Sequence, residues 1–294
     1  MSGVEVRSWC DDPAAVVDAC ERLGGRPVEV EPEPGVAARR SFSRDGWVVH
    51  VDEVADVGTF VAVCAGSATE AEVVTTALAV DEADVLRWPY DHLVAMHAAA
   101  RTWRARLAAA GDGAGRLVLV DGPSASGKTT LAHALVRDEG LHYVRRHTTR
   151  QRRSPDDDAE YVFVSADSFA ETAAAGGFLE YRHFEFGMSY GLAWDVALPP
   201  VVGGASALGV MNLGGVRWVK RLLPEAVTLL ITAPREDLAT RLLQRGVNTP
   251  EQIEERLGNA AKVEHYRPYY DHVVVNSEGR LDEALAEASA AIRA

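Results

Sequence analysis

The sequence predicts an α/β protein in which helices cover both faces of a parallel β-sheet, preceded by a smaller α+β domain. Strand-like and helix-like segments alternate from residue 116 onward, a pattern typical of parallel sheets. A glycine-rich segment follows one strand pattern and directly precedes a helix pattern. The composition, 47% hydrophobic and 25% charged, is that of a globular chain able to bury a core.

Apolar spacing and residues that break regular structure place the expected elements. An Ala- and Arg-rich stretch at residues 91–110 predicts a helix, which Gly111–Gly115 ends with a flexible connection. Short apolar runs predict strands at Leu117–Val120, Leu208–Met211, Val227–Ile231 and His272–Val275. Further helices are predicted at residues 127–138, 215–222, 235–245, 250–265 and 281–293. The glycine-rich connection predicts two domains, residues 1–110 and 116–294.

Charge and cysteine content argue against several classes of partner. A net charge of −13 argues against binding to nucleic acid or to an anionic membrane surface. No apolar run approaches the roughly 20 residues of a membrane span. The acidic start lacks the apolar segment of a secretory signal. Cys10, Cys20 and Cys64 follow no metal-binding spacing and predict free thiols in a reducing cytoplasm.

One segment departs from the acidic character of the chain. Residues Arg145–Arg153 are strongly basic. A short basic run in an acidic protein suits a small phosphorylated ligand better than a polymer, although a solvated run of charge has the same composition. The segment therefore predicts a small phosphorylated substrate as the binding partner.

The clearest motif is Gly122–Thr129, which fits G-x-x-x-x-G-K-[ST] at every defined position. Backbone N–H groups of such a loop curl around nucleotide phosphates, and the following helix presents its positive N-terminus to the same anion. The motif predicts a three-layer α/β/α P-loop kinase fold with ATP as cofactor. The residues expected to bind ATP are Gly122, Ser124, Ala125, Ser126, Gly127, Lys128, Thr129 and Thr130.

Two side chains of this loop have expected chemical roles. Lys128 can reach the β- and γ-phosphate oxygens, which makes it a candidate catalytic residue. The hydroxyl of Thr129 is the candidate ligand for Mg²⁺, which commonly keeps several of its waters. An aspartate that could hold Mg²⁺ through water is absent at Val210, and Asp121, directly before the loop, is not expected to replace it.

Residues 116–293 resemble the guanylate kinases. The motifs that carry the resemblance are Thr148-Thr149-Arg150 with Arg153, Tyr161–Ser165, Gly177–Glu180, Ser189-Tyr190-Gly191, Arg241–Gly246, Ile253–Leu257 and Tyr270–Asn276. The resemblance implies that four residues hold the acceptor phosphate, namely Arg150, Arg153, Tyr161 and Tyr190. It also implies lid and catalytic arginines at Arg245 and Arg256, and with less weight at Arg241. Forked guanidinium groups suit a phosphate dianion and the charge that migrates with it.

The positions at which guanylate kinases read the base are mostly changed. Glu180 is kept, but Arg146, Leu192 and the segment Val210–Asn212 replace the family's Ser, Ser/Thr and D-x-D. Each buried polar group of the base that is left without a hydrogen-bond partner costs ~1–3 kcal/mol of binding free energy. The loss of three of the four contacts makes GMP a doubtful acceptor. Arg146, Leu192 and Asn212 resemble instead the ribose 1,5-bisphosphate phosphokinases, although Arg153 and Tyr161 do not. We therefore expect a sugar phosphate or an unusual nucleotide as acceptor, bound also by Arg146, Glu180 and Asn212.

The first hundred residues resemble a shortened CYTH (triphosphate tunnel) domain. The resemblance rests on Val4–Arg7, Asp11–Pro13, Leu23–Gly25, Val51–Phe60 and Trp88–Leu93. The acidic metal-binding motifs of that family read Gly3–Arg7 and Phe60–Cys64 here, so most of their carboxylates are missing. A cation site needs those charges, and the domain is expected to be inactive. Assembly (including a homodimer), stability, or a wall beside the acceptor pocket remain open as its role.

Three other functions compete with the leading one. The chain could be a true guanylate kinase with an altered base pocket. It could transfer phosphate to a hydroxyl of a phosphorylated metabolite, with the arginines only anchoring the substrate. It could also be a non-catalytic guanylate kinase-like binding module, but such modules usually have a decayed phosphate loop, whereas Lys128 and Thr129 are intact here. The leading expectation is therefore an ATP-dependent phosphotransferase.

Overall fold

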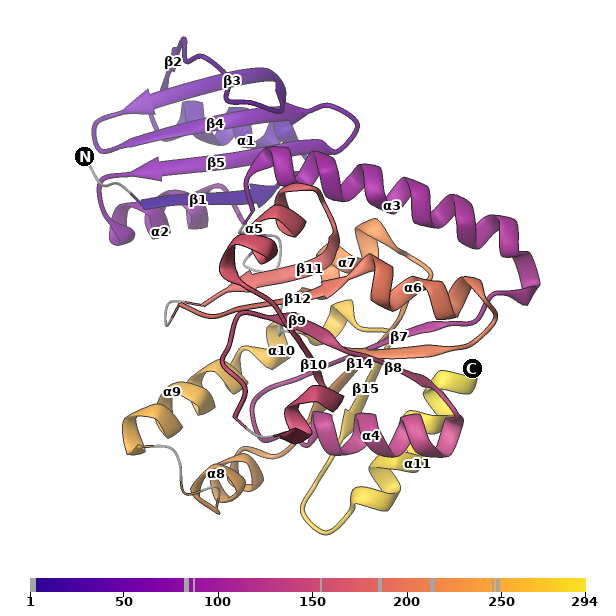
Figure 1. Cartoon of the computed structure of the whole chain (residues 1–294). Helices are drawn as coiled ribbons and strands as arrows, with labels where there is room; N and C mark the ends of the chain where they lie inside the picture. Colours follow the sequence, from indigo (N-terminus) through magenta and orange to yellow (C-terminus); the bar gives the residue numbers. More distant parts are fainter. Residues whose placement is uncertain are drawn as a thin grey trace. The chain divides into compact units, whose positions relative to one another are not determined.

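The computed structural model describes residues 4–81, 85–86, 88–153, 155–184, 187–211, 215–244, 246 and 249–294 (Figure 1). The chain divides into two compact units, one of Met1–Ala98 with Ala174–Gly176 and one of Ala99–Ala173 with Gly177–Ala294. The division falls within helix α3 (Tyr90–Ala110), since this helix continues unbroken up to the short 3₁₀ helix η2 (Gly111–Gly113). The predicted boundary at the glycine-rich segment therefore does not coincide with the division into compact units.

The first unit is built on a six-stranded antiparallel sheet in the order β2-β3-β4-β5-β1-β6. Its strands are β1 (Val4–Trp9), β2 (Arg26–Val28), β3 (Val36–Arg44), β4 (Trp47–Val54), β5 (Gly58–Ala65) and β6 (Val85–Leu86). Its helices α1 (Pro13–Arg22) and α2 (Ala68–Ala77) pack against a core that includes Cys20, Val49 and Val63. Asp12 and Ser67 begin these helices, each accepting a hydrogen bond from an N–H group of the first turn.

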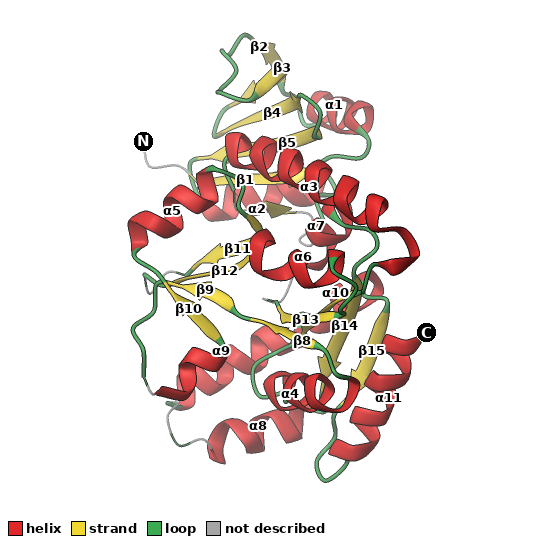
Figure 2. Ribbon diagram, turned by 45° about the vertical axis from the view of Figure 1, so that its right-hand side comes forward, coloured by secondary structure: helices red, strands yellow, loops and turns green. Residues whose placement is uncertain are grey.

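The second unit contains the predicted parallel sheet, in the order β15-β14-β7-β13-β8 (Figure 2). Its strands are β7 (Leu117–Asp121), β8 (His142–Val144), β13 (Ala207–Val210), β14 (Val227–Thr232) and β15 (His272–Val275). All four pairings are parallel. The predictions of an α/β fold and of strands at these four places after residue 116 are therefore confirmed.

Helices cover both faces of this sheet. Val118 and Val120 of β7 pack on one face against α4 (Lys128–Glu139) and α11 (Leu281–Arg293). On the other face lies α6 (Trp194–Val202), opposite α4 in both views (Figures 1 and 2). β7 is the central strand, so the segment that follows it lies in the middle of the sheet's carboxyl edge.

The second unit also contains a four-stranded sheet, whose strands lie in the spatial order β10-β9-β12-β11. Its strands are β9 (Arg146–Thr148), β10 (Tyr161–Phe163), β11 (Phe178–His183) and β12 (Ser189–Ala193). The 3₁₀ helix η3 (Pro155–Ala159) leads into β10, and α5 (Ala166–Ala174) follows it. Most residues expected to bind the acceptor lie on these strands, whereas the residues expected to bind ATP follow β7.

The remaining helices are α7 (Val216–Leu222), α8 (Arg235–Gln244), α9 (Pro250–Ala261), α10 (Val263–Tyr266) and the 3₁₀ helix η4 (Arg267–Tyr269). The single helix predicted at residues 250–265 is wrong, because the chain turns at Lys262 between α9 and α10. Val263 and Tyr266, which lie in the short helix after this turn, are buried. None of the helices in the described part of the chain has the length and apolar character to cross a membrane.

Asp271 anchors the start of β15. Its carboxylate accepts hydrogen bonds from the N–H and hydroxyl groups of Thr228, at 2.9 and 2.8 Å, and from the Lys220 amine at 3.0 Å. Burial by itself would raise the pKa of Asp271, but the bonds from Lys220 and Thr228 outweigh it and lower that pKa. The carboxylate therefore stabilises the fold above its ordinary pKa of 3.8 and loses this contribution as the pH falls through the lowered pKa.

Asp271→Asn is expected to lower the free energy of unfolding at pH 7 by about 1 kcal/mol. The effect is small because the side chain is 36% exposed and screened by water. The difference between the two proteins should narrow as the pH falls below 3.8 and through the lowered pKa of the folded carboxylate. Urea unfolding of both proteins, from pH 7 to below 3.8, measures this difference in the free energy of unfolding. A difference that does not change as the pH falls through this range would contradict the role of the charge.

Candidate active site

The phosphate loop joins β7 to α4 through backbone conformations that require glycine. Gly122 has a φ of 147°, and a Cβ atom there would lie 1.9 Å from the carbonyl oxygen of Ile231. Gly127 has a φ of 89°, and its Cβ would lie 2.3 Å from the side-chain nitrogen of Asn276. A larger residue at either place would push the loop away from β14 or β15. The first and second glycines of the motif thus set the path of the loop.

The start of α4 is open toward an anion. Gly127 is its N-cap and supplies no side-chain hydrogen bond, so the first N–H groups can point at phosphate oxygens. Thr129 and Thr130 are exposed in the first turn. The Ser126 hydroxyl is buried and has no hydrogen-bond partner among the described residues. This arrangement fits the phosphates of a nucleotide.

Lys128 folds back over the loop. Its amine donates to the carbonyl oxygens of Gly122 and Pro123, at 2.5 and 2.7 Å. These contacts keep the charge next to the place where the loop would hold phosphate. The predicted residues of the loop are therefore together, with the Lys128 amine at its mouth.

Residues distant in sequence support the loop. The Asn276 side chain donates to the Ser126 carbonyl oxygen at 2.8 Å. Arg241 of α8 donates to the carbonyl oxygens of Ala125 and Asn276, at 3.4 and 3.0 Å, and pairs with Glu278 at 3.0 Å. Arg241 thus braces the back of the loop in this structure. Asn276 is the last residue of the Tyr270–Asn276 motif, but the sequence does not show that its side chain contacts the loop.

Arg256 of α9 reaches the loop from another side. It donates to the Ser124 hydroxyl at 2.9 Å, and α8 and α9 share an apolar cluster that includes Ala125. The helix that carries Arg256 is therefore packed next to the ATP-binding segment, as a charge for phosphoryl transfer would require. The other predicted catalytic arginine, Arg245, lies outside the described residues.

Strand register gathers the acceptor residues on one face of the four-stranded sheet. Arg146 of β9 is in register with Tyr161 of β10, and Thr148, two residues further, with Tyr190 of β12. Side chains two residues apart on a strand share a face, so Arg146, Tyr161 and Tyr190 do so. The rings of Tyr161 and Tyr190 lie 6.0 Å apart, and the Arg146 guanidinium lies 5.4 Å from the Tyr190 ring.

Glu180 joins this group from β11. It is in register with Leu192 of β12, two residues beyond Tyr190. One Arg146 nitrogen lies 3.8 Å from a Glu180 carboxylate oxygen, and both residues are buried, 8% and 2% exposed. We call Arg146, Tyr161, Glu180 and Tyr190 the acceptor face.

Arg150 lies next to the acceptor face and is paired with a carboxylate. Its guanidinium donates to Asp157 at 3.1 Å and lies 4.9 Å from the Tyr161 ring. The hydrogen bond and charge of Asp157 raise the pKa of Arg150. The sequence showed Asp157 only as part of a turn-rich acidic segment, and its role as the partner of Arg150 depends on how η3 folds back.

The remaining predicted residues are less well placed. The Arg153 side chain is exposed, and only its backbone N–H takes part, donating to Asp157 at 2.7 Å. Arg153 therefore helps to shape the loop in this structure, and its guanidinium is not part of the acceptor face. Leu192 is fully buried. Asn212 lies outside the described residues.

The metal prediction rests on the loop alone. The described residues contain no group of three or more His, Cys, Asp or Glu side chains suited to a metal ion. Val210 packs against the apolar cluster between the sheet and α4. The residues present fit a Mg²⁺ ion held by Thr129 and nucleotide phosphates, since this ion often has few protein ligands.

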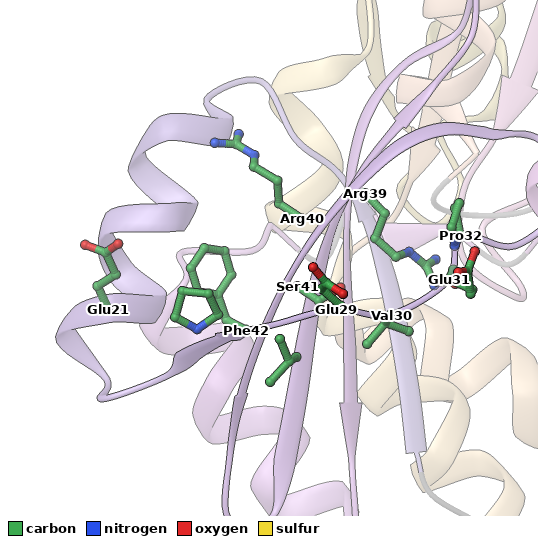
Figure 3. A pocket seen from close by; sticks show the side chains of 11 residues that line it. Glu21, Glu29, Val30, Glu31, Pro32, Arg39, Arg40, Ser41 and Phe42 are labelled. Atoms are coloured by element: carbon green, nitrogen blue, oxygen red, sulfur yellow. Dashed lines mark hydrogen bonds between the residues drawn. The ribbon is translucent and has the colours of Figure 1, made fainter.

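The first unit contains a cavity of about 750 Å³ lined by residues of β2, β3 and the segment after β2 (Figure 3). Arg39 points into it, but this side chain pairs with the fully buried Asp52 at 2.6 Å and with Glu33 at 3.0 Å. Glu21, Glu29 and Glu31 add negative charge to the lining. The cavity therefore lacks the excess of positive charge that a polyphosphate needs.

Comparison with known proteins agrees with this geometry. The family model for guanylate kinase matches residues 114–294. The guanylate kinase of Hahella chejuensis is 36% identical over 184 residues, covering 61% of this chain and 86% of that protein. The guanylate kinase of Mycolicibacterium paratuberculosis is 40% identical over 182 residues, covering 60% of this chain and 80% of that protein.

A crystal structure of guanylate kinase from Anaplasma phagocytophilum aligns with a TM-score of 0.48 and 24% sequence identity, and covers 61% of this chain and 85% of that chain. The family match rests on the sequence, since the family model spans more than half of the 294 residues and includes the phosphate loop and the acceptor face. This chain belongs to the guanylate kinase family of ATP-dependent kinases.

Proposed function

We propose that this chain transfers the γ-phosphoryl group of ATP to GMP. The observation that carries the proposal is the buried pair of Glu180 and Arg146 on the face that also bears Tyr161 and Tyr190. The relatives named above are guanylate kinases, which supports GMP over the sugar phosphate expected from the changed base positions. The changed base positions argue against GMP only if Arg146 makes no contact with guanine.

The pair is chemically complementary to guanine. The N1–H and N2 amino groups of guanine are donors, which a carboxylate such as that of Glu180 accepts. Its O6 and N7 atoms are acceptors, and a guanidinium is the side chain that most often binds them. Arg146 would thus supply the donor that the family's serine supplies, from the same position of β9. Because both residues are buried, each contact would be formed away from water.

The acceptor phosphate would bind next to this pair. Arg150 has a forked guanidinium already oriented by Asp157, and the hydroxyl groups of Tyr161 and Tyr190 add donors. A phosphate dianion would compete with the Asp157 carboxylate for Arg150. Asp157 would thus neutralise the guanidinium and hold it in place until the acceptor binds.

Phosphoryl transfer needs position and positive charge more than a base. ATP would supply the migrating group, and a Mg²⁺ ion held by Thr129 and the nucleotide would neutralise part of its charge. Lys128 at the mouth of the loop and Arg256 at Ser124 are cations positioned beside the loop that would hold the phosphates. Arg245 remains a predicted third cation. Closure of α9 over the loop would exclude water from the reaction.

Several finer predictions remain open beside this proposal. The resemblances to ribose 1,5-bisphosphate phosphokinases and to CYTH domains, the homodimer and a hydroxyl acceptor stay predictions. The binding-module alternative is disfavoured because Lys128 and the loop glycines have the geometry of an intact phosphate loop. The division into a domain of residues 1–110 and a domain of residues 116–294 likewise stays a prediction.

ADP release should be robust with Mg·ATP and GMP, and weak or absent with AMP, UMP, CMP and ribose 1,5-bisphosphate. Lys128→Ala, which loses the cation at the β- and γ-phosphates, should abolish turnover and serves as the blank. Turnover with ribose 1,5-bisphosphate and none with GMP would overturn the proposed acceptor while leaving the kinase assignment intact.

Glu180→Gln should lower kcat/KM for GMP by about 10- to 100-fold, because an amide nitrogen would then face the guanine donors. The loss should be smaller with IMP, which lacks the N2 amino group. Comparing the two nucleotides at saturating ATP measures this difference, and thermal unfolding checks that the variant is folded. Equal losses with GMP and IMP would mean that Glu180 does not contact the N2 amino group.

Arg150→Ala should raise the KM for GMP by about tenfold or more and leave the KM for ATP nearly unchanged, since a charged hydrogen bond to the acceptor is lost. Arg152→Ala is the matched control. Arg152 belongs to the same basic run, but its side chain is 55% exposed and pairs with Asp158 at 2.7 Å. If both variants behave alike, Arg150 has no special contact with the acceptor.

A further inference from the structure

Asp121 is a fully buried carboxylate at the end of β7, directly before the phosphate loop. One of its oxygens accepts the N–H of Gly122 at 2.6 Å, and the other accepts the hydroxyl of Tyr270. Burying a charge is costly unless it is paired and hydrogen-bonded. The residues expected to contact ATP and the acceptor do not explain why a carboxyl group is buried here.

The two peptide groups that flank the Gly122 Cα are each hydrogen-bonded to a side chain. Asp121 accepts the Gly122 N–H, and Lys128 donates to the Gly122 carbonyl oxygen at 2.5 Å. Burial raises the pKa of Asp121, and the bonds from Tyr270 and Gly122 and the charges of Lys128 and Arg146 act in the opposite direction. Asp121 and Lys128 thus bond on either side of the glycine whose conformation starts the loop.

Tyr270 connects this carboxylate to a distant part of the chain. The two residues are 149 positions apart, and Tyr270 is 7% exposed. Tyr270 ends the segment α9, α10 and η4, whose first helix carries Arg256. The next residue, Asp271, is fixed to Thr228 and Lys220. The end of the segment that carries Arg256 is therefore hydrogen-bonded, through Tyr270, to the residue directly before the phosphate loop.

A direct role for Asp121 in metal binding fits the geometry poorly. Both oxygens already accept hydrogen bonds, and the side chain is fully buried behind the loop, whereas Thr129 is exposed at its mouth. A purely structural role would explain the burial, but a neutral side chain would avoid the cost of desolvating a charge next to a phosphate site. The contact with Gly122 and the nearby Lys128 charge indicate a role in the loop.

We propose that Asp121 and Tyr270 are positioning residues for ATP, which fix the Gly122 peptide and thereby the place of the Lys128 amine. The pair acts through the loop and contacts neither phosphate nor acceptor. Removing either partner lets the Gly122 peptide rotate, so that Lys128 and the loop N–H groups are no longer held in one geometry. ATP binding should weaken, whereas binding of the acceptor should not.

The test is isothermal titration of Mg·ATP into the full chain and into four variants. Asp121→Asn and Tyr270→Phe should each weaken ATP binding, by about tenfold for Asp121→Asn and less for Tyr270→Phe. The double variant should bind ATP no worse than the weaker-binding single variant, because the two residues act as a unit. Asp271→Asn is the matched control, since it loosens the same segment one residue away without touching the loop; its ATP affinity should be unchanged.

Steady-state kinetics complete the test. The KM for ATP should rise in Asp121→Asn and Tyr270→Phe, and the KM for the acceptor should stay within about twofold. Unchanged ATP affinity in a folded Tyr270→Phe protein would overturn the proposal, as would an equal loss in Asp271→Asn. ATP titration needs no acceptor, so the outcome is independent of whether GMP is the substrate.

Discussion

The site depends on one close contact, that of Gly122 with the carbonyl oxygen of Ile231. Only a residue without a Cβ atom can turn away from β7 at this point, because an added Cβ would lie 1.9 Å from that oxygen. The turn brings the loop over the carboxyl edge of the central strand and aims the start of α4 at the same place. The contacts of Lys128, Asn276, Arg241 and Arg256 all presuppose this path.

On the acceptor side the organising feature is paired charge. Arg150 is matched by Asp157 next to the Tyr161 ring. Arg146 is matched by Glu180, on strands whose register puts Arg146 beside Tyr161 and Tyr190. Such pairs hold guanidinium groups in place before the substrate arrives, which reduces the reorganisation that binding requires. In the proposed function, two arginines with different partners would bind the two ends of the acceptor. Arg150 would exchange the Asp157 carboxylate for the acceptor phosphate, whereas Arg146 would bind the base together with Glu180.

Sequence reasoning succeeded where the signal was local. The phosphate loop, the central strand and the helix after it were predictable because glycine spacing and apolar runs act over a few residues. It failed where contacts cross the chain. Asp121 meets Tyr270 across 149 positions, and Arg241 donates to a carbonyl oxygen of the loop from α8. Taken as a single position, Arg146 predicts a lost base contact, because the sequence does not show that Glu180 lies beside it.

The Arg146 and Glu180 pair also restricts how this family member could change its substrate in evolution. Both residues are buried, so replacing one of them would leave the other charge in a dry interior, at a cost of about 3–5 kcal/mol. Most natural proteins are not stable enough to tolerate such a loss easily. In this chain, a change of Glu180 would therefore be better tolerated if Arg146 changed with it, since that guanidinium would otherwise lose its nearby carboxylate.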